Sequence, residues 1–326
     1  MNSSLKITLA LAAVTGIAAL SQPVVAQSER NFPSKPIRMV TTAAGSQNDT
    51  LARMIGTKLS ERWGQPVVME NRAGAGGAIA GAIVAKAAPD GYTILHQSPQ
   101  FAIGAALNAN LPYNVLRDFA GITQIGYSTD VLVVTPSLGV KSVKEFIALA
   151  HARSGPLLFS SASAGSSMHI SGERFRFTTG IKATHVGFKG SPEALIEVMA
   201  ARVHYAVPGL GLAMPSIKDG RLVALAVNSP QRSPQLPDVP AMTEVLPGYA
   251  KDGSFGLLAP AKTPRPILNK INAEVRRIFE LPDVQERLQT MGVLATPTSP
   301  EEYDKTLRAE IETFTKVAKL VGLRAQ

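Results

Sequence analysis

The stretch from Ile37 to Trp63 constrains the fold of this chain more than any other. An apolar run at residues 37–40 stops at Ala43-Ala44-Gly45, and the polar residues 46–49 lead into a segment whose apolar residues recur at helical spacing. This pattern predicts a strand, a tight turn and the start of a helix. Such a turn directs unpaired backbone N–H groups and the positive end of a helix dipole at one place, so it predicts a site for an anion such as a carboxylate.

The same order of elements recurs in the middle of the chain. Leu157–Ser160 has the composition of a buried strand, Ser161–Ser167 is a polar turn that contains a glycine, and a helical pattern starts at Met168. We therefore expect a second anion-facing turn in a second half of the molecule.

The segments between and after the two turns predict the architecture. Pro66–Asn71 and Tyr92–His96 read as strands separated by an alanine-rich helix, which favours a parallel sheet with right-handed crossovers. Ligands of such sheets bind beyond the carboxyl ends of the strands, so we expect Gln97–Phe101 and the first turn to share one rim. The predicted fold class is α/β, with two doubly wound lobes, a central ligand cleft and a hinge. We expect residues 27–126 and 252–326 to form the first lobe and residues 127–251 the second.

The N-terminus predicts export. Lys6 precedes the apolar run Ile7–Leu20, and Val24-Val25-Ala26 fits the small-residue pattern of a cleavage site. We interpret residues 1–26 as a signal peptide, and expect a soluble periplasmic protein. The run is shorter than the roughly 20 residues that span a bilayer, which disfavours a membrane anchor. The chain has no Cys, which excludes disulfides, thiolate metal sites and a lipid anchor on an N-terminal cysteine.

Charge and glycine patterns exclude other classes of partner and cofactor. The formal net charge of +9 favours anionic partners, but the basic residues are scattered singly, so we expect no nucleic acid. His96, His151 and His204 lack metal-ligand spacing, and we expect no metal. The glycine-rich stretch 74–77 lacks both the dinucleotide fingerprint and a phosphate-binding Lys-Ser/Thr pair, so no nucleotide cofactor is expected either.

Several short stretches together resemble one family, the solute-binding proteins of the tripartite tricarboxylate transporters. The stretches that carry the resemblance are Asn31–Arg38, Gly64–Gly77, Ala87–Thr93, Leu111-Pro112-Tyr113, Arg232-Ser233-Pro234, Leu236–Pro240 and Gly256–Pro260. Their order and number, over essentially the whole mature length, make the resemblance specific. It implies a type II periplasmic-binding-protein fold that closes on a small carboxylate and delivers it to transmembrane permease subunits. We expect a monomer that is not an enzyme.

The resemblance also implies which turns hold the carboxylate: Ala43–Asp49 and Ser163–His169, the two turns already singled out. With neighbouring residues, the predicted ligand-binding set is Ala44, Gly45, Ser46, Asn48, Asp49, Gln97, Phe101, Ser163, Gly165, Ser166, Ser167, His169, Phe188, Lys189 and Pro208. Lys189 could attract an anion, and Phe101 and Phe188 could supply an apolar wall.

Departures from the family pattern bear on the ligand. The first turn carries more side-chain hydrogen-bonding groups than is usual in the family, and Ser254 stands where a tryptophan is common, which leaves more room. We therefore expect a di- or tricarboxylate bulkier than succinate, such as the aromatic terephthalate. An amino-acid ligand is less favoured, because we expect no acidic side chain other than Asp49 near the rim.

Three alternatives stay open at the level of sequence. Asp49 fits a residue of the first helical turn as well as a ligand contact. Ser166 and Ser167 lie close to His169, so a hydrolase is the enzyme alternative, although no Gly-x-Ser-x-Gly elbow is present. A receptor that presents its closed form to a sensor kinase would use the same binding chemistry as a transport receptor.

Overall fold

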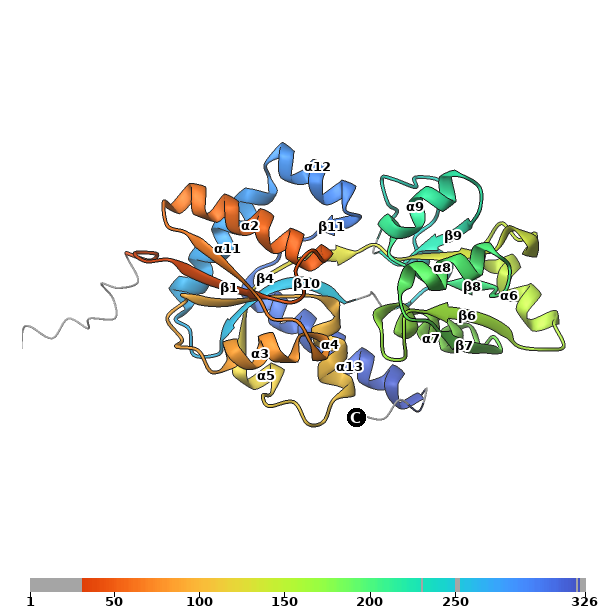
Figure 1. The fold of residues 1–326 in the computed structure, drawn as a ribbon, viewed down its shortest axis with the longest axis horizontal. Helices are drawn as coiled ribbons and strands as arrows, with labels where there is room; N and C mark the ends of the chain where they lie inside the picture. The colour runs from red at the N-terminus through yellow and green to blue at the C-terminus, as the bar shows by residue number, and fades with distance from the viewer. Residues whose placement is uncertain (1–30, 230, 250–252, 321, 323–326) are drawn as a thin grey trace, which may run out of the picture.

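The computed structural model describes residues 31–229, 231–249, 253–320 and 322, and these form two lobes, each built around one sheet (Figure 1). The predicted signal peptide, residues 1–26, and the predicted lobe boundary at residues 251 and 252 lie outside the described residues. The alternation of strands and helices confirms the α/β class.

The first lobe contains a six-stranded mixed sheet in the order β11-β4-β10-β3-β1-β2. Its strands are β1 (Ile37–Thr41), β2 (Val67–Asn71), β3 (Thr93–Gln97), β4 (Phe119–Ser128), β10 (Ser254–Pro260) and β11 (Val293–Ala295). Its helices are α2 (Gln47–Trp63), α3 (Ala78–Ala85), α4 (Pro99–Leu107), α5 (Val115–Asp118), α11 (Arg265–Phe279), α12 (Pro282–Thr290) and α13 (Pro300–Leu320), with the 3₁₀ turn η1 (Ala75–Gly77). As predicted, β2, β1 and β3 are parallel, whereas β10 and β4 each run antiparallel to a neighbour.

Alternation along β1 explains how this sheet is covered on both faces. Ile37 and Met39 join the apolar cluster with α2 and α11, while Val40 points to the opposite face and joins the cluster under α3, α4 and α13. The chain returns to the first sheet as strand β10, and every residue of it is buried. A long segment of the second half of the chain therefore completes the core of the first lobe.

The second lobe contains a five-stranded sheet in the order β7-β6-β8-β5-β9. Its strands are β5 (Val131–Val134), β6 (Leu157–Ser161), β7 (Ala183–Gly187), β8 (Tyr205–Ala206) and β9 (Val223–Val227). Its helices are α6 (Val143–Ala152), α7 (Ser167–Thr179), α8 (Ser191–Met199), α9 (Leu210–Lys218) and α10 (Met242–Val245), with the 3₁₀ turn η2 (Pro136–Leu138).

Side-chain packing and backbone hydrogen bonds join the lobes where the chain crosses between them and beside those crossings. The last turns of α13 reach from the first lobe to α7, where Phe314 and Val317 share an apolar cluster with Ile170 (Figure 1). The chain crosses between β4 and β5, and there the Thr129 N–H donates to the Gly292 carbonyl at 2.9 Å. The carboxyl ends of β1 and β6, with the turns that follow them, lie where the lobes meet.

Candidate functional site

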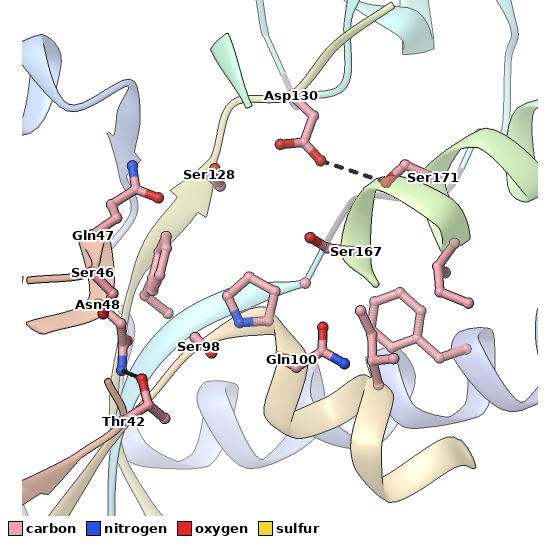
Figure 2. Close-up of a pocket in the computed structure, with 16 residues that line it drawn as sticks. Thr42, Ser46, Gln47, Asn48, Ser98, Gln100, Ser128, Asp130, Ser167 and Ser171 are labelled. Atoms are coloured by element: carbon pink, nitrogen blue, oxygen red, sulfur yellow. Dashed lines mark hydrogen bonds between the residues drawn. The ribbon is translucent and has the colours of Figure 1, made fainter. Parts of the chain in front are cut away.

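A cavity of about 260 Å³ lies between the two lobes (Figure 2). Its lining is drawn from the turns and helix starts of both lobes, from the crossing segments, and from α13: Thr42, Ser46, Gln47, Asn48, Ser98, Pro99, Gln100, Ile103, Ser128, Asp130, Ser167, Ile170, Ser171, Gly253, Phe255 and Phe314. Small-molecule sites are typically about 300–1,000 Å³, so this cavity suits a small solute. Most of the lining side chains that carry polar atoms are uncharged hydroxyls and amides.

The first turn is built by a serine cap. The Ser46 hydroxyl accepts the Asp49 N–H at 3.2 Å and donates to the Ala43 carbonyl at 2.7 Å. Gly45 has φ +74°, a left-handed conformation that L side chains rarely adopt, and its N–H donates to the Asp49 carboxylate at 2.9 Å. The turn is thus closed by its own residues.

The second turn repeats this construction in the other lobe. The Ser166 hydroxyl accepts the His169 N–H at 3.2 Å and donates to the Ser163 carbonyl at 2.8 Å. Gly165 has φ +78°, and its N–H donates to His169 Nδ1 at 3.0 Å. Asp49 and His169 therefore hold equivalent positions, each accepting the N–H of the turn glycine.

The two turns leave the same groups available at the cavity. A helix start has N–H groups without intrahelical acceptors, and each serine cap satisfies only the N–H of the third helical residue. The N–H groups of the first helical residues, Gln47 and Ser167, have no acceptor within their helices, and both residues line the cavity. Paired N–H groups and positive helix ends from two lobes form an arrangement that can bind a carboxylate.

A third helix start joins them at α4. Ser98 is the residue before this helix and Pro99 opens it, and both line the cavity with Gln100. The Gln100 side-chain amide donates to the Gly165 carbonyl of the opposite lobe at 3.2 Å. The middle of the predicted rim segment thus lines the cavity, but the sequence pattern was interpreted as the polar exit of a strand and not as a helix. A serine followed by proline is typical of a helix start and could have indicated α4.

Asp49 is buried behind the cavity wall and has three partners. Its carboxylate accepts from Gly45 N–H, from Asn71 Nδ2 at 2.8 Å and from Arg53 Nε at 3.0 Å. Burial opposes ionisation, but these hydrogen bonds and the Arg53 charge outweigh it, so the pKa of Asp49 lies below its usual range. This geometry favours the first-turn role over direct ligand contact.

His169 is buried in a cluster of the second lobe. Its ring lies 3.9 Å from the His185 ring, and Nε2 is 3.7 Å from Glu173, which also pairs with Arg176. Burial, together with the neighbouring His169, lowers the pKa of His185 to about 4. The Ser166 hydroxyl is used in the cap and His169 Nδ1 accepts from the turn, so neither is arranged as a nucleophile and its base.

The structure brings three of the predicted site residues to the cavity: Ser46, Asn48 and Ser167. Seven others build the two turns behind it without lining it: Ala44, Gly45, Asp49, Ser163, Gly165, Ser166 and His169. A direct contact between these ten residues and a ligand stays a prediction.

The other five predicted residues lie away from the cavity wall. Phe101 packs against Tyr113 and Phe119 in the core of the first lobe. Gln97 is buried and donates to the Ser254 carbonyl at 3.0 Å. The remaining three lie in the second lobe: Phe188 packs on the apolar core, Lys189 is exposed, and the carbonyl of buried Pro208 accepts the Val131 N–H.

Several lining residues were not anticipated. Phe255 and Phe314 supply the aromatic wall in place of Phe101 and Phe188. Asp130 lines the cavity at the crossing between lobes, so the expectation of no acidic side chain other than Asp49 near the rim is wrong. The sequence feature that could have indicated Asp130 is its place directly before the apolar run at residues 131–134. This run forms strand β5, which begins at the junction of the lobes.

Two negative findings concern the described residues alone. No three His, Asp or Glu side chains among them come together as a metal site. None of the helices within the described ranges is long and apolar enough to cross a membrane.

Comparison with known proteins identifies the family. Residues 51–323 match the model of the tripartite tricarboxylate transporter family receptor. A protein of Pseudomonas sp. (strain P51), a UPF0065 protein from the tcbD-tcbE intergenic region, is 34% identical over 88% of this chain and 86% of its own length.

Solved structures agree with this match. Rpa4515 of R. palustris, solved with adipate, is 32% identical with a TM-score of 0.72 over 89% of this chain and 98% of its own. MatC from Rhodopseudomonas palustris, solved with bound malate, is 30% identical with a TM-score of 0.69 over 88% of this chain and 99% of its own. The two-lobed type II periplasmic-binding fold is thus confirmed, and this chain belongs to the tripartite tricarboxylate transporter receptor family.

Proposed function

We propose that this protein is a periplasmic receptor that captures a small carboxylate between its lobes and delivers it to the transmembrane permease of a tripartite tricarboxylate transporter. The observation that carries the proposal is the pair of equivalent serine-capped turns, one from each lobe, at a single cavity. The adipate and malate bound to the two structural neighbours support a carboxylate as the solute class. For the hinge, we propose crossings near residues 126–127 and 251–252.

The proposed mechanism is closure of the lobes around the solute. A carboxylate that spans the cavity contacts N–H groups of α2 and α4 on one side and of α7 on the other only when the lobes are together. A ligand shifts a conformational equilibrium by its differential affinity for the two states, so this double contact favours the closed form. A permease could then recognise the loaded receptor by its closed shape.

The test is a thermal-shift screen of mono-, di- and tricarboxylates, followed by calorimetry. The set includes adipate, malate and terephthalate, the last because Phe255 and Phe314 offer an aromatic wall. We expect at least one acid to raise the Tm, since a ligand at 100 times its Kd stabilises the folded state by about 2.7 kcal/mol. If no acid shifts the Tm, the proposal fails, and if an acid is consumed, a hydrolase replaces it.

A receptor for a sensor kinase would pass the same screen. Deletion of the gene separates the two roles, because loss of solute uptake supports the transport role, whereas intact uptake with loss of a transcriptional response supports the signalling role.

A further inference from the structure

We propose that His169 is a positioning residue that makes solute binding sensitive to pH. The second turn keeps its solute-binding shape only while the Nδ1 atom of His169 carries no proton, so the affinity for the solute falls as the pH falls. This role rests on the proposed receptor function and adds a pH control to the same site. The two turns, otherwise equivalent, differ in the side chain that accepts the N–H of the turn glycine.

The first turn uses a carboxylate as this acceptor. The Gly45 N–H donates to Asp49 at 2.9 Å, and because the hydrogen bonds of Asp49 outweigh its burial, its pKa lies below the usual range. The second turn uses an imidazole, since the Gly165 N–H donates to His169 Nδ1 at 3.0 Å. Histidine changes its charge between about pH 5 and 8, and its protonated ring is a donor at both nitrogens. Mild acid can therefore remove the acceptor of the second turn and not that of the first.

Loss of this acceptor would change the turn at the cavity. A protonated Nδ1 would set its own N–H against the Gly165 N–H, so the ring or the turn would have to move. The Gly165 carbonyl also accepts the Gln100 amide of the first lobe at 3.2 Å. Ser167, two residues further along, lines the cavity. A proton on His169 therefore affects both the solute wall of the second lobe and a hydrogen bond between the lobes.

The surroundings of the ring place the proton on His169 and not on its neighbour. The His185 ring lies 3.9 Å from that of His169, and burial, with His169 beside it, lowers the pKa of His185 to about 4 although Glu173 opposes the shift. His185 thus stays neutral in mild acid. A protonated His169 would have Glu173 as its counter-ion, because Nε2 lies 3.7 Å from this buried carboxylate.

Other groups complete the surroundings of the His169 ring. The titratable and charged side chains around it are Glu173 and Arg176 of α7, His185 of β7 and Tyr205 of β8. Strand β6 contributes the uncharged Phe159 ring, whose centroid lies 6.1 Å from that of His169. Helices α4 and α13 meet α7 through an apolar cluster of Ile103, Phe314, Val317 and Ile170.

The first experiment needs no solute. NMR on the full ¹⁵N-labelled chain follows the imidazole nitrogens of His169 and the amide of Gly165 between about pH 8 and 5.5. We expect Nδ1 to be unprotonated at the upper end, and the Gly165 amide to lose its hydrogen-bonded chemical shift as Nδ1 takes up a proton. A ring that takes up no proton in this range, or a Gly165 amide that does not follow the ring, would overturn the inference.

The second experiment measures the Kd of adipate, malate and terephthalate by calorimetry over the same range. Since binding would release one proton, we expect the Kd of an acid that binds to rise by at most about tenfold per pH unit as the pH falls. His169→Asn offers Oδ1 in place of Nδ1 and cannot be protonated, so its Kd should change only as the solute itself titrates. His169→Gln leaves the Gly165 N–H without this acceptor and should bind weakly at every pH.

Controls separate this role from the receptor function. His151→Asn changes an exposed histidine of α6 and should keep the pH dependence of the wild type. Equal pH dependence in wild type and His169→Asn would contradict the inference, as would tighter binding by the wild type in acid, which would mean that the charge of the imidazolium attracts the solute. If none of the three acids binds, the proposed solute class fails, while the NMR titration still decides the role of His169. That titration uses the wild type, so it holds even if His169→Asn does not fold.

Discussion

Single residues at this site divide into those that shape the turns and those that face the cavity. Asp49 and His169 accept the N–H of Gly45 and Gly165, and each lies behind the wall it helps to form. Ser167 lies one residue beyond the Ser166 cap and faces the cavity instead. Adjacent residues of one turn therefore have different roles, so single substitutions can separate the role in shaping the turn from the role in binding the solute.

His96 predicts an acid-sensitive loss of stability. It is fully buried and neither ring nitrogen has a partner among the described residues, so burial lowers its pKa to about 3, with Asp49 opposing the shift. Between pH 6.5 and about 3 the unfolded chain binds a proton that the folded chain does not. The free energy of unfolding should therefore fall as the pH falls, by roughly 1 kcal/mol per pH unit from this group.

His96→Leu should reduce that slope, measured by urea denaturation at several pH values between 7.5 and 4. His185 contributes a slope of the same sign that remains in the variant. Replacement of the exposed His151 by leucine is the control. Equal slopes for wild type and His96→Leu would contradict the prediction.

Ser166 and Ser167 offer a matched test of the two roles. Ser166→Ala removes the cap of α7 and should lower the free energy of unfolding by about 1 kcal/mol. Ser167→Ala leaves the cap intact and should instead weaken solute binding by about 1 kcal/mol, with little change in stability. Denaturation and calorimetry on both variants check the split, and a reversed result would show that the cap serine is the ligand contact.

At the scale of elements, strands and helix starts were predictable where hydrophobic period and turn chemistry agree. The turns after β1 and β6 were predicted because serine, glycine and polar residues separate an apolar run from a helical pattern. Helix α4 was missed because its short, weakly amphipathic sequence has no polar face to reveal the period. Phe101 was predicted to face the cavity, but the helix turns it towards Tyr113 in the core.

Two glycines test how closely these elements are packed. In Gly126→Ala the new Cβ would lie 2.2 Å from the backbone oxygen of Leu294, so β4 and β11 would have to separate. We expect a loss of about 1–3 kcal/mol of stability or more. Gly104→Ala within α4 meets nothing within 4 Å and should stabilise the protein by about 0.5–1 kcal/mol. Chemical denaturation measures both, and equal effects would contradict the packing argument.

At the scale of the whole molecule, the lobes are joined on several sides. Gln100 of the first lobe donates to the Gly165 carbonyl of the second, and Gln235 donates to the Gln289 carbonyl at 2.5 Å on another side of the junction. Contacts of this kind join residues far apart in the chain, and no periodic pattern records them. The same reason explains why Asp130 was not predicted as part of the cavity.

Gln100→Ala should shift the lobes towards the open form. We expect a larger radius of gyration in X-ray scattering without added solute, because a hydrogen bond across the cleft is lost. Gln235→Ala removes the other hydrogen bond between the lobes, away from the cavity, and shows whether the loss of any such bond opens the lobes or only the loss of the one at the cavity. If neither variant changes the scattering, the lobes are held by the α13 contact with Ile170 instead.

The hydrogen bond from Gln100 to the second turn also affects how well a membrane partner can distinguish a receptor with bound solute from a receptor without it. Protein groups alone make this bond, so it lowers the free energy of the closed lobes by the same amount with and without a solute. Receptor molecules that are closed but hold no solute would compete with loaded receptors for the membrane partner. Their docking would deliver no solute. The discrimination between loaded and unloaded receptor would then come from the remaining contacts, those that only the solute completes.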